Sequence, residues 1–151
     1  RLVGRRGHLG RLLQDTPPSW LTMVDRGATT VWEEWEGIDD DGVAHASLNH
    51  YSKGAVISFL HQYVAGLQII KPAYRRFRVA PHPGGGITSA HTHHDSPHGR
   101  VEIAWSIADG TGTIDITVPD GTTSDLHLPD GHHESLDPGI HQRRWPSPPQ
   151  P

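Results

Sequence analysis

The spacing of apolar residues changes once along the chain, and this change constrains the fold more than any other feature. Between Ala55 and Leu67 apolar residues recur every three or four positions, which is the period of a helix with one buried face. From Phe77 onward they alternate with polar or small residues, most clearly at Val101, Ile103, Trp105 and Ile107. A period of two predicts strands with one buried face. The sequence therefore predicts an α + β chain in separate parts, helical first and then an antiparallel sheet.

Turn sequences separate the predicted strands and indicate how they connect. Ala-Asp-Gly-Thr-Gly, Pro-Asp-Gly-Thr and Pro-Asp-Gly-His occur in this order, and such sequences favour tight connections between antiparallel neighbours. We expect the helical part over residues 1–76 and the sheet part over 77–142. The tail 143–151, with four prolines in its last six residues, is predicted to be disordered.

A shorter helix is predicted before the long one. Thr16 can cap it with Pro17 at its first position, and Gly27 can end it. The next segment, residues 28–36, is predicted to be an extended loop. Residues 1–11 hold three glycines, which disfavour a helix, and we expect a frayed edge there.

Composition excludes several classes of partner. A net charge of −4 over 151 residues argues against nucleic-acid binding, and no apolar run is long enough for a membrane span. The absence of cysteine rules out a disulfide framework and leaves the compartment open, cytoplasmic or secreted. The chain begins with Arg1 and has no signal-peptide pattern, so we expect its true N-terminus to lie elsewhere.

An acidic and aromatic cluster is the strongest chemical signal. Residues 32–36 contain three carboxylates and two indoles, followed by Gly37. Indoles stack on the apolar face of a pyranose, and a carboxylate can act as acid, base or nucleophile at the anomeric carbon. The alternative interpretation is an amphipathic strand with a solvated acidic edge.

Three blocks of sequence carry a resemblance to a known family. They are Pro-Pro-Ser-Trp-Leu-Thr-Met-Val-Asp-Arg-Gly-Ala-Thr-Thr-Val-Trp-Glu-Glu-Trp-Glu-Gly (17–37), Ser-Leu-Asn-His-Tyr (47–51) and Arg-Phe-Arg-Val-Ala-Pro-His-Pro-Gly-Gly-Gly (76–86). The order and spacing of these blocks are those of the family. Over residues 12–131 the chain resembles the C-terminal end of bacterial alpha-L-rhamnosidases of glycoside hydrolase family 78. The resemblance implies the last helices of an (α/α)6 catalytic barrel followed by an antiparallel β-sandwich. It also implies that the chain is a C-terminal fragment of a longer enzyme.

The resemblance implies roles for individual residues. Family 78 enzymes invert the anomeric configuration, and the Glu after the first Trp of Trp-Glu-x-Trp, here Glu33, is the water-activating base. Glu34 occupies the variable position of that motif, and Glu36 is interpreted as structural. The matching histidine, His50, is implied to hold rhamnose beside the scissile bond.

Other implications concern the aromatic residues and the missing half of the site. Trp32 and Trp35 could stack on sugar or pack around the barrel mouth, and both readings stay open. The general acid lies upstream in the family, in a segment that this chain lacks, so we expect the fragment to be inactive alone. The implied partners are a rhamnose-containing glycoside and the missing N-terminal part of the same enzyme, with no cofactor.

Two further functions compete with this one. The first is a non-catalytic carbohydrate-binding β-sandwich, although Trp105 alternates with aliphatic residues and is predicted to lie in the core. The second is a metal-binding protein, because eight residues hold His91, His93, His94, Asp95 and His98, and imidazoles can share zinc or nickel. The family has no matching metal motif there, so we predict no specific metal site. The polar turn at 38–42 lacks the spaced oxygens of an EF-hand calcium loop.

Overall fold

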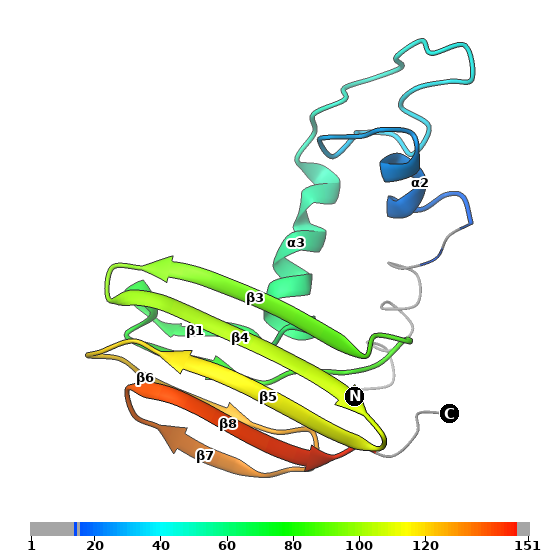
Figure 1. The fold of residues 1–151 in the computed structure, drawn as a ribbon. Helices are drawn as coiled ribbons and strands as arrows, with labels where there is room; N and C mark the ends of the chain where they lie inside the picture. Colours follow the sequence, from blue (N-terminus) through cyan, green and yellow to red (C-terminus); the bar gives the residue numbers. More distant parts are fainter. Residues whose placement is uncertain (1–13, 15, 148–151) are drawn as a thin grey trace. The chain divides into compact units, whose positions relative to one another are not determined.

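The computed structural model describes residue 14 and residues 16–147 (Figure 1). The chain divides into two compact units, Arg1–Ser58 and Phe59–Pro151. The frayed edge predicted for residues 1–11 lies outside the described residues. None of the helices in the described part is long and apolar enough to cross a membrane.

The first unit contains the helix α2 (Trp20–Asp25). Its N-cap is Ser19, whose hydroxyl accepts the N–H of Thr22 at 3.0 Å, so the helix begins after the two prolines and not at Thr16 as predicted. The predicted stop at Gly27 is confirmed. Gly27 has a φ of 83°, and its N–H donates to Val24 O while that of Ala28 donates to Met23 O, both at 2.9 Å. This pair of bonds is a Schellman motif.

The predicted helix from Ala55 to Leu67 is present but differs in its ends and its winding. It starts with the 3-10 turn η1 (Ser52–Gly54), continues as α3 (Ala55–Phe59) and closes as the π-helical segment η2 (Leu60–Val64). The chain then reverses at Gly66, which has a φ of 91° and whose Cβ, if present, would lie 2.4 Å from Pro81 N. Because only glycine fits there, the helix ends before Leu67, which is the first residue of a strand.

The second unit is a sandwich of two four-stranded sheets (Figure 1). One sheet has the order β1-β2-β6-β7 and the other β3-β4-β5-β8. The strands are β1 (Leu67–Lys71), β2 (Arg76–Val79), β3 (Ser89–Ser96), β4 (Gly99–Ala108), β5 (Thr111–Val118), β6 (Thr123–His127), β7 (His133–Leu136) and β8 (Gly139–Pro146). The predicted class, a helical part followed by a β-sandwich, is confirmed.

The meander β3-β4-β5 is antiparallel as the turns predicted, but β2 pairs with β6 in parallel. The sheet part also begins and ends away from the predicted limits. β1 lies before residue 77, and Arg143–Pro146 continue β8 where a disordered tail was expected. Trp145 explains this strand end, because its indole is buried to 1% exposure and its burial stabilises the ordered chain.

The core lies between the two sheets and follows the alternation seen in the sequence. Val101, Ile103 and Trp105 are buried, and so are Phe77, Val79, Ile114, Ile116, Leu126, Leu136 and Trp145. Each large apolar side chain contributes roughly 1.5–3 kcal/mol when buried. The indole N–H of Trp105 donates to Val64 O at 3.0 Å, which ties η2 to the sheet. Trp105 is therefore a core residue, as predicted.

Candidate functional site

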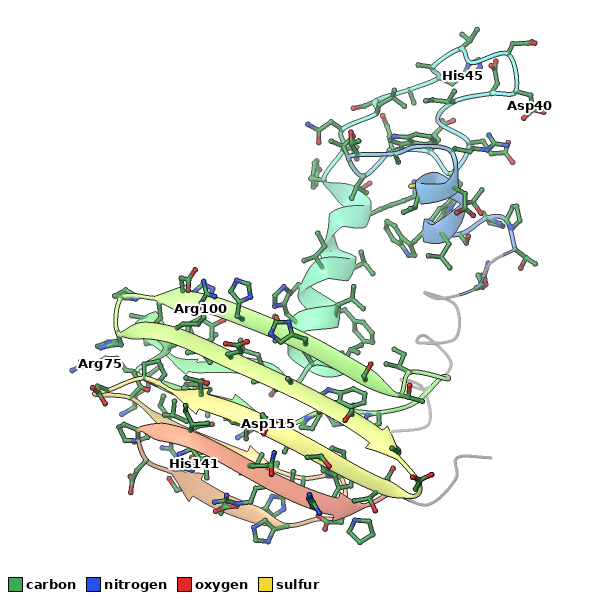
Figure 2. All side chains as sticks on the ribbon, viewed as in Figure 1. Asp40, His45, Arg75, Arg100, Asp115 and His141 are labelled. Carbon is green, nitrogen blue, oxygen red and sulfur yellow. The ribbon has the colours of Figure 1, made fainter. Side chains whose placement is uncertain are left out.

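Two loops of the first unit form the candidate site, residues 28–37 and 45–50 (Figure 2). They are joined by backbone hydrogen bonds of 2.8 Å from His50 N–H to Val31 O, from Glu33 N–H to Ser47 O and from His45 N–H to Gly37 O. The two sequence blocks that carry Glu33 and His50 are therefore brought together by their backbones, although neither loop is a regular strand.

The carboxylate of Glu33 is exposed and is oriented by the neighbouring loop, residues 45–50. Its Oε2 accepts the N–H of Ser47 at 3.2 Å, and its main-chain oxygen accepts a hydrogen bond from Lys53 Nζ. A carboxylate held at one oxygen keeps further lone pairs for other donors, a water molecule among them. Glu34 and Glu36 are exposed on the same loop.

His50 is oriented through one ring nitrogen. Its Nδ1 accepts the N–H of Ser52 at 3.2 Å and lies 2.8 Å from the Ser52 hydroxyl. When Nδ1 is an acceptor, a neutral imidazole carries its proton on Nε2. The ring also stacks on Tyr51, with centroids 4.9 Å apart. This arrangement leaves Nε2–H to donate to a ligand.

The two tryptophans of the cluster lie in different environments. Trp32 is 2% exposed, and its ring atom Cε3 lies 3.0 Å from the position that a Cβ on Gly37 would take. Trp35 is half-buried, with Trp20 packed edge-on at 5.0 Å and Lys53 Nζ 4.8 Å from its ring centroid. Trp32 thus fills the interior of the loop, whereas part of Trp35 remains accessible.

Lys53 and Ser47 are site residues that the sequence did not indicate. Lys53 contacts both the main chain of Glu33 and the ring of Trp35, and the cation over the indole is a favourable cation–π arrangement. Nothing in the sequence distinguishes this lysine from an ordinary surface residue. Ser47 contacts Glu33 through its main-chain groups, while its hydroxyl donates to Asn49 O at 3.1 Å and accepts the Asn49 N–H at 3.2 Å, which shapes the loop.

The polar turn at 38–42 is held by hydrogen bonds to the carboxylate of Asp39. Asp39 Oδ1 accepts the N–H groups of Asp41 and Val43, and Oδ2 lies 2.7 Å from His45 Nε2. The hydrogen bond with His45, followed by that with Val43, lowers the pKa of Asp39. Asp39 therefore stabilises the turn, which is closed by an Ile38–Ala44 bridge.

The histidines of β3 contact different neighbours, although the ring centroids of His91 and His93 lie 6.1 Å apart. His91 Nε2 lies 2.8 Å from Glu102 Oε1, His94 packs on Tyr74 with centroids 4.4 Å apart, and Asp95 is paired with Arg100. In residues 14 and 16–147, no three His, Asp or Glu side chains are grouped to hold a metal ion.

Comparison with known proteins identifies the family of this chain. Residues 66–141 match the bacterial alpha-L-rhamnosidase C-terminal domain, and residues 5–64 match the bacterial alpha-L-rhamnosidase 6 hairpin glycosidase domain. The chain belongs to the bacterial alpha-L-rhamnosidase family. The resemblance seen in the sequence is confirmed, and the two matches meet where η2 ends and β1 begins.

Individual members of the family are similar over most of this chain. An alpha-L-rhamnosidase of Streptomyces avermitilis is 37% identical over 131 residues, and one of Formosa agariphila is 32% identical over 129 residues. Each alignment covers 83% of this chain but only 13% and 14% of the relative. The chain therefore spans about one-seventh of the length of these curated relatives.

Solved alpha-L-rhamnosidase structures share the fold. The Aspergillus terreus enzyme superposes with a TM-score of 0.84 and 30% identity, covering 92% of this chain and 17% of that one. The Streptomyces avermitilis enzyme complexed with L-rhamnose also gives a TM-score of 0.84, with 29% identity over 95% of this chain and 16% of that one.

Proposed function

We propose that this chain is part of an inverting alpha-L-rhamnosidase that releases terminal L-rhamnose from glycosides, with Glu33 as the base and His50 as a sugar ligand. The observation that carries the proposal is the pairing of the two loops. It holds a carboxylate and an imidazole donor on hydrogen-bonded segments in a chain of the rhamnosidase family.

Inverting hydrolysis needs two carboxyl groups on opposite sides of the sugar. In our proposal a free lone pair of Glu33 accepts a proton from water as the water oxygen attacks the anomeric carbon. A carboxylic acid from another part of the longer protein protonates the departing glycosidic oxygen. Because the attack comes from the face opposite the leaving group, the configuration is inverted.

The neighbouring residues have supporting roles in this proposal. His50 donates from Nε2 to a hydroxyl of rhamnose, and the accessible part of Trp35 contacts the apolar face of the sugar. The burial of Trp32 favours the packing interpretation that the sequence left open, in which its ring packs against Gly37 inside the loop. Lys53 fixes the main chain of Glu33.

The first test uses the longer enzyme. Glu33→Gln preserves the shape but removes the base, so kcat should fall by roughly 10²–10⁴, the usual contribution of general acid–base catalysis, with a much smaller change in KM. Glu34→Gln and Glu36→Gln are the matched controls and should be milder. NMR of the first product should show the inverted anomer. Wild-type turnover in Glu33→Gln, or a larger loss in Glu34→Gln, refutes the assignment.

The second test uses the 151-residue chain itself. We propose that it does not hydrolyse an aryl rhamnoside, because the general acid and most sugar contacts come from elsewhere in the enzyme. Release of the aryl group is followed by absorbance, with the longer enzyme as the positive control. Turnover by the purified chain, free of host enzyme, would contradict the proposed division of the catalytic pair.

A further inference from the structure

The second unit contains a pocket that the proposed reaction does not use. Its volume is about 480 Å³, and its lining residues are Lys71, Arg75, Arg76, Gly121, Thr123 and Ser135. Small-molecule sites fall roughly between 300 and 1,000 Å³, so a monosaccharide-sized ligand fits this class. Figure 2 labels Arg75 near the ends of the strands.

The strand register explains why these residues meet. Lys71 of β1 lies opposite Arg76 of β2, and Arg76 lies opposite Thr123 of β6. Side chains of β2 alternate, so that Phe77 and Val79 enter the core while Arg76 lies on the other, solvent-facing side. The cations and the hydroxyl of Thr123 thus form a row across three strands, outside the apolar core.

The charge of this row is not balanced. Asp125 pairs with Arg76, whose Nη2 lies 3.0 Å from its carboxylate. Within the described part of the chain, no residue forms an ion pair with Lys71 or Arg75. Two positive charges therefore lie unpaired in the pocket, although the whole chain has a formal net charge of −4. The guanidinium fork of arginine matches the oxygens of a carboxylate or a sulfate group.

The turn that carries the cations has an unusual backbone. Ala73 and Tyr74, in η3 (Pro72–Tyr74), both have a φ of 58°, a region that non-glycine residues seldom occupy. Tyr74 is held by ring contacts with His94 and Phe77. The ends of this turn are Lys71 and Arg75, so their backbone positions are fixed before any ligand arrives, which lowers the entropy cost of binding.

We propose that this pocket binds an anionic saccharide through a carboxylate or sulfate group, separately from Glu33. The charge of the ligand follows from Lys71, Arg75 and the hydroxyls of Thr123 and Ser135. Its saccharide nature rests on the proposed function. None of the lining residues is aromatic, so a neutral sugar has no ring to stack on and should not bind.

The experiment is an NMR titration of the ¹⁵N-labelled full chain at constant ionic strength and pH 7. The probes are glucuronate, glucose 6-sulfate, inorganic sulfate and glucose. We expect saturable amide shifts at Gly121, Thr123 and Ser135 with the two anionic sugars, weaker shifts with sulfate and none with glucose. Sulfate binding as tightly as the sugars overturns the saccharide assignment. Absent shifts, or shifts spread over all cationic surfaces, overturn the site.

Variants test the lining residues. Lys71→Gln and Arg75→Gln should each weaken binding at least tenfold, whereas Arg144→Gln, an exposed change on β8 of the other sheet, should not. Ser135→Asp leaves the η3 turn untouched and adds a negative charge to the lining, so it should also abolish binding. Wild-type affinity in Arg75→Gln and Ser135→Asp refutes the proposal. Since binding requires no turnover, this failure is distinct from any failure at Glu33.

Discussion

Arg143 and Glu134 join the two sheets of the sandwich at one side. Arg143 Nε lies 2.6 Å from Glu134 Oε1, and its Nη2 lies 2.9 Å from Oε2, so the pair is bidentate. Glu134 belongs to β7 and Arg143 to β8, which are end strands of different sheets. Each partner shifts the other: the pKa of Glu134 is lowered and that of Arg143 is raised, mainly by their hydrogen bond.

Removing this pair should loosen the sandwich. Arg143→Gln is expected to lower the free energy of unfolding by about 1 kcal/mol, since the pair is bidentate but still partly solvated. The neighbouring Arg144→Gln is the control and should change it little. Urea unfolding of Arg143→Gln, Glu134→Gln and the double variant measures the coupling energy. A coupling energy of zero would contradict a stabilising pair.

The pair of Glu134 and Arg143 also makes the free energy of unfolding depend on pH. The pKa of Glu134 is lower in the folded chain than its ordinary value of 4.5. The unfolded chain therefore binds a proton first, and the stabilisation present above about pH 4.5 is lost as the pH falls through the folded pKa. Unfolding free energies measured from pH 6 to pH 3 should fall more steeply in the wild type than in Glu134→Gln. Parallel curves would contradict this contribution.

A second pH effect is expected at His127. Burial, followed by the charges of Arg78 and His133, lowers the pKa of His127 below 6.5. The stability that neutral His127 contributes is fully present above pH 6.5. It is lost as the pH falls through the lower pKa of His127 in the folded chain, because the unfolded chain gains the proton first. His127→Gln should therefore flatten the fall in melting temperature between pH 7 and pH 5. An unchanged slope would show that His127 is not the responsible group.

Gly112 should not tolerate a side chain. It lies opposite Trp145 in the register of β5 and β8, and a Cβ there would lie 2.0 Å from Trp145 Cε2. Gly112→Ala forces the indole out of its place and should cost about 1–3 kcal/mol of stability. Gly54→Ala, where no atom lies within 4 Å of the new Cβ, is the control. Denaturant unfolding measures the stability of both variants. If Gly112→Ala is as stable as Gly54→Ala, the Trp145 indole does not pack over Gly112.

The helix carries apolar side chains that are exposed in the described part of the chain. Ile57 is 53% exposed and Leu60 is 37% exposed, and exposed apolar residues that lie close together promote association. The isolated chain should therefore self-associate, and Ile57→Lys or Leu60→Lys should reduce this. Val43→Lys, at a loop position that is 54% exposed, is the control. Sedimentation velocity measures the distribution, and a monomeric wild type at all concentrations would contradict the prediction.

The sequence predicted those parts of the fold whose signals are local. The alternation at Val101, Ile103 and Trp105 identified β4 and its buried face, and Gly27 marked the end of α2. The sequence did not indicate the strand β1, because its first residue, Leu67, continues the apolar spacing of the preceding helix. The reversal depends on Gly66 meeting the backbone of Pro81, which is a contact between distant residues.

The candidate site was predictable only in part for the same reason. The spacing of Trp32, Glu33 and Trp35 singled out the loop, but their different burial depends on which ring packs against Gly37. Lys53 was not recognised, because its link to Glu33 requires the two loops to be paired. The prolines near the end of the sequence predict disorder from residue 143 onward. This prediction is wrong for Arg143–Pro146, because the burial of Trp145 in the sandwich core outweighs the unfavourable composition around it.

The parallel pairing of β2 with β6 has a consequence for the order in which the second unit folds. β3, β4 and β5 lie between these two strands in the sequence, so the first sheet closes only after the ribosome has delivered the whole meander. Until then one edge of β2 has no neighbour, and such non-local pairings slow folding. Local hairpins should form first and the β2–β6 seam last. A nascent chain halted before Thr123 would expose this edge to other nascent chains, so the aggregation risk of this unit is greatest just before β6 is synthesised.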